Sequence, residues 1–88
     1  MAAYRIELTR RARRSLSEEL PEEVAAACWE FITNVLAHNP LRVGKALRAD
    51  LAGRFSARRG DFRVIYEIHD DKVVIRIVDV RHRRDVYR

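Results

Sequence analysis

The chain has 88 residues, 48% of them hydrophobic, and a formal net charge of +5. This length suits one domain with a small core, and the apolar content argues against intrinsic disorder. Because no apolar run approaches the roughly 20 residues that a bilayer requires, and the N-terminus has no signal-peptide core, we expect a single cytoplasmic domain over residues 1–88 without a membrane partner.

A strand pattern and two helical patterns follow one another in the first half of the chain. Apolar residues alternate with charged ones over residues 3–8, which predicts a strand. Thr9 can cap a first helix, and Pro21 suits the first position of a longer one that ends before Pro40. We expect the two helices to form a hairpin, and the wide apolar surface of the second predicts contact with the sheet and with the first helix or a bound protein.

Three further strand patterns follow a connector at residues 40–53, in which a short turn is expected near 46–51. The last pattern is apolar on nearly both faces, which is typical of a central strand. The sequence therefore predicts an α+β fold, β-α-α-β-β-β, with a helical hairpin on one face of a small, mainly antiparallel sheet and arginines on the other. The expected strands are 54–58, 62–68 and 72–80, with turns at 59–60 and 70–71.

Positive charge is concentrated in the second half of the chain. Residues 1–40 carry five Arg and six Glu, a net of −1, whereas residues 41–88 carry thirteen Lys and Arg against seven Asp and Glu, a net of +6. Such a basic half predicts a nucleic acid or an acidic protein as partner. Arg10 and Arg11 lie at the positive end of the first helix dipole, which indicates either an anionic partner there or an indifferent surface.

The cysteine and histidine content gives no indication of a metal or cofactor site. Cys28 is the only cysteine and belongs to an apolar helical stripe, so we expect a buried, inert thiol. No CxxC or HExxH spacing occurs, and the three histidines are far apart in sequence. We therefore expect neither a metal nor a cofactor.

Candidate RNA-binding residues occupy one face of two predicted strands. Arg54, Ser56 and Arg58 alternate with apolar residues, and Arg63 lies opposite the apolar face of the next strand. If the turn keeps these faces aligned, Arg54, Ser56 and Arg63 converge with the arginine-rich tail. Guanidinium groups there would stabilise charge on a pentacoordinate phosphorus. The alternative is that each arginine is solvated surface.

The tail at residues 81–88 adds an aromatic residue and a titratable one. Tyr87 suits stacking on a base. His82 is the only tail residue that titrates near neutral pH, which makes it the candidate general acid or base. The alternative for His82 is a solvated or hydrogen-bonded residue at the end of a strand. Arg81 and Arg84 are candidate RNA-binding residues beside them.

Nearly the whole chain resembles the RelE branch of the RelE/ParE toxin superfamily. The resemblance rests on residues 40–88 and 4–16, and its most specific segments are GDFRVIYEI and the ending HRRDVYR. It implies a type II toxin that cleaves mRNA in the ribosomal A site, where a ribose 2′-hydroxyl attacks its own 3′ phosphate without a metal. It also implies a small RelB-like antitoxin that wraps the toxin, and contact with operator DNA only through that complex.

The resemblance also implies roles for individual positions. Arg63 matches the phosphate-binding arginine, Arg83 the arginine that assists the leaving group, and Tyr87 the stacking tyrosine. Arg54 stands where a basic residue, commonly lysine, is found. Ser56 stands where a second lysine is common, and this departure weakens the usual account of 2′-hydroxyl activation, because serine is a poor base.

Two explanations of catalysis without that lysine stay open at this point. In the first, His82 activates the 2′-hydroxyl in place of the lysine. In the second, the ribosome and the positioning of the RNA supply most of the acceleration, and the enzyme is slow. Three other functions also stay open: a gyrase-inhibiting toxin of the ParE branch, a catalytically weak member that acts through antitoxin and operon binding, and a plain RNA-binding domain.

Overall fold

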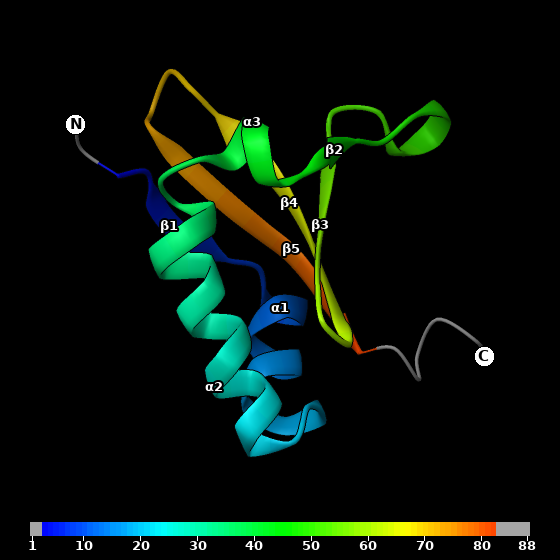
Figure 1. Ribbon diagram of the computed structural model, residues 1–88. Helices are drawn as coiled ribbons and strands as arrows, with labels where there is room; N and C mark the ends of the chain where they lie inside the picture. Colours follow the sequence, from blue (N-terminus) through cyan, green and yellow to red (C-terminus); the bar gives the residue numbers. More distant parts are fainter. Residues whose placement is uncertain (1–2, 83–88) are drawn as a thin grey trace.

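Five strands and a set of helices make up residues 3–82, the part of the chain that this computed structural model describes (Figure 1). The strands are β1 (Arg5–Leu8), β2 (Lys45–Ala46), β3 (Phe55–Arg59), β4 (Phe62–His69) and β5 (Val74–His82). They form one sheet in the order β1-β5-β4-β3-β2, in which β1 runs parallel to β5 and the other neighbours are antiparallel. The predicted α+β class with a mainly antiparallel sheet is confirmed.

The predicted helical hairpin lies on one face of the sheet. Thr9 caps its first helix as expected: its Oγ1 accepts the Ala12 N–H at 3.1 Å and donates to the Val78 carbonyl at 2.7 Å, which ties the helix start to β5. No helix between residues 3 and 82 combines the length and apolarity needed to cross a bilayer. The hairpin comprises α1 (Arg10–Arg14) with the π-helical turn η1 (Ser15–Glu19), and α2 (Glu22–Phe31) with the π-helical turn η2 (Ile32–Leu36) (Figure 1).

Tyr66, in the middle of β4, organises the core at the β2 side of the sheet. Its ring stacks on Phe55 with centroids 5.6 Å apart, and its hydroxyl donates to the Pro40 carbonyl at 2.5 Å. Gly44 packs so closely against this ring that a Cβ at that position would overlap the phenol. The side chain of Tyr66 is fully buried, so these contacts fix the backbone just before β2.

The connector is more structured than its sequence indicates. Beyond the expected turn, present as a 3-10 turn η3 (Ala49–Leu51), it contains the short helix α3 (Pro40–Val43) and the strand β2. Proline at the first position of a helix requires no N–H partner. This explains why Pro40, which was expected only to end the preceding helix, starts α3. Two residues are too few to show a period of two, so no pattern predicted β2.

The turn between β4 and β5 is longer than the expected turn at 70–71. Val73 has φ of 54°, a left-handed conformation that is rare for a β-branched residue, and it closes a turn over 70–73. The last strand therefore begins at Val74 and ends at His82 rather than covering 72–80. It lies between β1 and β4, as its two apolar faces predict.

Candidate nucleic-acid interface

Three arginines lie side by side on the face of the sheet away from the helices. The register pairs Arg58 of β3 with Arg63 of β4, and Arg63 with Arg81 of β5. The adjacent residues Ala57 and Val64 are fully buried in the core, so the alternation of a strand places the arginines on the opposite face. Like charges directly opposite one another destabilise a sheet. Folding alone therefore does not favour this arrangement, which we call the arginine row (Arg58, Arg63 and Arg81).

One buried carboxylate, that of Asp79, compensates the end of the arginine row at β5. Its Oδ2 accepts a hydrogen bond from Arg81 Nε at 2.9 Å and another from Arg11 Nε at 3.2 Å, and its Oδ1 accepts the Val80 N–H at 2.9 Å. The side chain of Asp79 is only 6% exposed. Asp79 thus supplies, from within the chain, the anionic partner that the unfavourable dipole position of Arg11 indicated.

Arg54 immediately precedes β3 and belongs to a second, compensated cluster. Its Nε donates to Glu67 Oε2 at 3.4 Å, and Glu67 Oε1 lies 3.1 Å from His69 Nε2. Glu67 comes from β4, one strand away, and is half-buried. Much of the Arg54 charge is therefore balanced by a neighbour in the fold. His69 is the last residue of β4.

Arg58 and Arg63 have no such compensation. Among residues 3–82, neither forms an ion pair with a carboxylate. Arg58 is exposed and Arg63 is half-buried, so both guanidinium groups reach solvent. A planar guanidinium presents a donor fork that matches two phosphate oxygens. The pair is thus suited to one phosphodiester linkage bound across β3 and β4.

A lysine that no sequence pattern singled out lies beside the arginine row. Ser56, two residues before Arg58 along β3, pairs with Ile65 of β4 on one side and with Lys45 of β2 on the other. Directly opposite residues share a face, so Lys45 lies on the face of the arginine row. The place of Lys45 became evident only through the pairing of β2 with β3.

The predicted tail residues are described only in part. Arg83, Arg84 and Tyr87 lie outside the described residues, so their roles stay predictions. His82 ends β5, where it pairs with the buried Phe62 and is partly exposed. Its position in the alternation is on the helix face of the sheet, opposite the arginine row. A role for His82 in proton transfer stays a prediction that this placement does not favour.

The thiol of Cys28 and the phenol of Tyr66 are buried and kept protonated. Burial raises the pKa of Tyr66 and that of Cys28 to about 12 each, so neither is a base or a nucleophile at neutral pH. Cys28 is the inert, buried thiol that the sequence predicted. Between residues 3 and 82, no group of three or more His, Cys, Asp or Glu side chains gathers where it could hold a metal ion.

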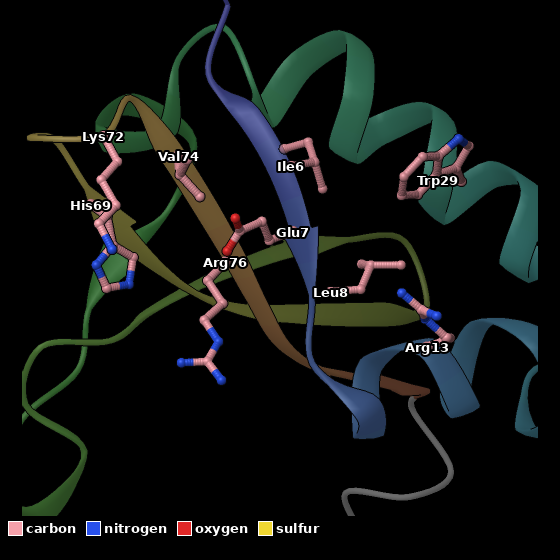
Figure 2. A pocket seen from close by; sticks show the side chains of 9 residues that line it. All are labelled: Ile6, Glu7, Leu8, Arg13, Trp29, His69, Lys72, Val74 and Arg76. Carbon is pink, nitrogen blue, oxygen red and sulfur yellow. The ribbon is translucent and has the colours of Figure 1, made fainter.

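A groove of about 550 Å³ follows the exposed edge of β1, away from the arginine row. Figure 2 shows Ile6, Leu8 and Trp29 on one side of β1 together with Arg13, and Glu7 and Arg76 on the other. Trp29 of α2 is 44% exposed there. Of the predicted catalytic residues that the structure describes, none lines this groove, whose walls are Ile6, Glu7, Leu8, Arg13, Trp29, His69, Lys72, Val74 and Arg76.

Comparison with known proteins places the chain among bacterial toxins. Residues 6–87 match the family described as the ParE toxin of the type II toxin–antitoxin system parDE. The chain is 48% identical over 85 residues to Toxin RelG of Mycobacterium tuberculosis, which covers 97% of each chain. It is 47% identical to Toxin RelE of the same organism, over 97% of this chain and 87% of that protein.

Solved structures show the same fold. The toxin–antitoxin complex RelBE2 of Mycobacterium tuberculosis contains a chain that superimposes with a TM-score of 0.89 at 46% identity, over 93% of this chain and 100% of that one. The isolated E. coli RelE toxin superimposes with a TM-score of 0.74 at 21% identity, over 97% of this chain and 92% of that one. At that identity the second match concerns the fold alone.

Proposed function

The chain belongs to the RelE/ParE family of type II toxins, and on this premise we propose that it is an endoribonuclease that cleaves mRNA in the ribosomal A site. The observation that carries the proposal is the pair of Arg58 and Arg63 on the open face of the sheet, neither of which forms an ion pair with a carboxylate of residues 3–82. Two adjacent cations without a carboxylate are costly in a folded sheet and useful where an anion is bound. The relatives named RelG and RelE, at 48% and 47% identity, favour the RelE branch.

The reaction that suits this face is transesterification within the RNA. The 2′-oxygen forms a bond to the adjacent phosphorus, the bond from phosphorus to the 5′-oxygen breaks, and the 2′-hydroxyl proton is lost while the leaving oxygen gains one. Negative charge increases on the non-bridging oxygens in the transition state. Guanidinium groups of Arg58 and Arg63 directed at those oxygens stabilise that state more than the ground state.

Among residues 3–82, the carboxylates of this face are engaged by neighbours: Glu67 contacts Arg54 and His69, and Asp79 accepts hydrogen bonds from Arg11 and Arg81. Arginine stays protonated, Ser56 is a poor base, and His82 belongs to the other face of the sheet. We therefore attribute the acceleration to charge stabilisation and to the orientation of the RNA by the ribosome. The proposal also gives a role to two tail residues. Arg83 assists departure of the 5′-oxygen, and Tyr87 is a stacking platform for a base.

The proposed protein partner is a small antitoxin of the RelB type. The RelBE2 complex of Mycobacterium tuberculosis contains a chain 46% identical to this one together with its antitoxin. An acidic segment of such a partner would be attracted to a toxin of net charge +5. Contact with operator DNA would then occur only through the toxin–antitoxin complex.

Ribosomes programmed with a defined codon in the A site test the proposal. Purified protein is added and the 5′ ends of the message are mapped by primer extension, with Arg63→Gln as the matched variant. We expect cuts within the A-site codon that slow by about 10²–10³ in the variant, the usual effect of removing one group that stabilises the transition state. An intact message would refute the nuclease proposal. Trapped gyrase–DNA complexes in a parallel assay would then favour a gyrase-inhibiting toxin of the ParE type. ParE is the toxin that gives the matched family its name.

A further inference from the structure

We propose that Lys45 binds the phosphate next to the one held by Arg58 and Arg63, so that the RNA strand crosses Ser56 toward the β2 edge of the sheet. The inference rests on the proposed function and adds the path of the substrate to it. It depends on the pairing of β2 with β3, which places Lys45 directly opposite Ser56.

The spacing of the sheet suits neighbouring phosphates. Lys45 is one strand away from Ser56, about 4.8 Å, and Ser56 is two residues, about 7 Å, from Arg58 along β3. The backbone positions of Lys45 and Arg58 are thus about 8 Å apart, on the order of one nucleotide step of an extended strand, and both side chains are long and exposed. The short side chain of Ser56 between them leaves the path open.

The charge of Lys45 is free to meet an anion. Within the described range 3–82 it forms no ion pair, in contrast to Arg54 with Glu67 and Arg81 with Asp79 on the same face. A binding contact needs only a single strong point charge, which lysine supplies, whereas arginine forks suit the reacting phosphate. The three cations Lys45, Arg58 and Arg63 thus form a continuous diagonal across β2, β3 and β4.

The backbone under Lys45 is held in place although β2 has only two residues. Immediately before it, Gly44 packs against the buried ring of Tyr66. Immediately after β2, the Leu47 N–H donates to the Arg54 carbonyl at 2.8 Å, which extends the pairing with β3. A site built on an anchored strand loses less conformational entropy on binding than one on a loose loop.

Single-turnover cleavage on programmed ribosomes tests the inference, because the plateau rate and the half-saturating toxin concentration can be measured separately. A contact made equally in the ground state and the transition state affects only the second quantity. We expect Lys45→Ala to raise the half-saturating concentration roughly tenfold, equivalent to about 1.4 kcal/mol, with an unchanged plateau. Lys45→Arg should restore most of the affinity. Lys72→Ala, the other lysine of the chain and in the distant β4–β5 turn, should behave as wild type.

Messages with one uncharged methylphosphonate linkage, placed in turn on each side of the reacting phosphate, identify the phosphate concerned. Where the uncharged linkage replaces the phosphate that Lys45 binds, the lysine has no charged partner left to lose. At that one position, wild type and Lys45→Ala should therefore have the same half-saturating toxin concentration. An equal loss in the variant at both positions, or no loss in Lys45→Ala on the unmodified message, would overturn the inference. If Arg63→Gln also cleaves as wild type, the proposed role of the arginine pair has failed, whereas an uncut message with the wild-type protein would refute the nuclease function itself.

Discussion

Removal of one charge from the arginine row should stabilise the fold while it slows the proposed cleavage. Arg63→Gln keeps a long polar side chain without the charge. Because Asp79 compensates Arg81, the main repulsion on Arg63 comes from Arg58. Two unit charges about 6–8 Å apart in water repel by about 0.5–0.7 kcal/mol, which lies within the usual range for cross-strand pairs. We therefore expect the free energy of unfolding to rise by about 0.5 kcal/mol at low salt.

Urea denaturation followed by circular dichroism measures this gain. It should disappear at about 1 M salt, where the Debye length falls to about 3 Å from about 30 Å at 0.01 M. Arg76→Gln is the matched control, because it lowers the net charge equally on the same face, but Arg76 lies opposite Glu67 in the register. Equal gains in both variants would attribute the effect to net charge, and a loss of stability in Arg63→Gln at low salt would refute the reasoning.

Four further outcomes are expected. His82→Ala should change the cleavage rate on programmed ribosomes less than tenfold, because His82 occupies the helix face; a fall of about 10²–10⁴ would make it the general base. Gly44→Ala should lower the free energy of unfolding in urea by about 1–3 kcal/mol, because its Cβ would overlap Tyr66, and an unchanged midpoint would contradict this. Asp79→Asn should cost about 1–3 kcal/mol in the same assay, because two arginines donate to this carboxylate; stability equal to wild type would count against that role. Burial raises the pKa of Tyr66 from 10.0 and that of Cys28 from 9.0 to about 12, so the folded state binds more protons between pH 9 and 12 and stability should fall as pH rises through that window, whereas a flat profile from pH 8 to 11 would argue against it.

Periodicity was sufficient for the long elements of the fold. The helical hairpin and the strands β3 and β4 have enough residues to show a period, and their predicted bounds lie close to those observed. The parallel pairing of β1 with β5 depends on contacts between distant parts of the chain that no local pattern carries. The start of β5 was misplaced because Val73 adopts a left-handed conformation that its side chain does not suggest.

The candidate site was predictable where it lies on long strands and not elsewhere. The alternation of β3 and β4 placed Arg58 and Arg63 each opposite the apolar face of its own strand, and the register brings the two side by side. Lys45 was missed because its strand is too short to have a pattern. The face of His82 depends on where β5 ends and on its pairing with β4, which the sequence does not specify.

The buried position of Cys28 leaves residues 3–82 without an accessible thiol. A cysteine introduced at the exposed Asp71, in the β4–β5 turn, would therefore be the thiol that a maleimide dye reaches in this part of the chain. That turn is about 20 Å along β4 from Arg63, at roughly 3.3 Å per residue. A fluorophore there would test the proposed ribosome contact, because it would report binding and release without a change to the face that is proposed to meet the message.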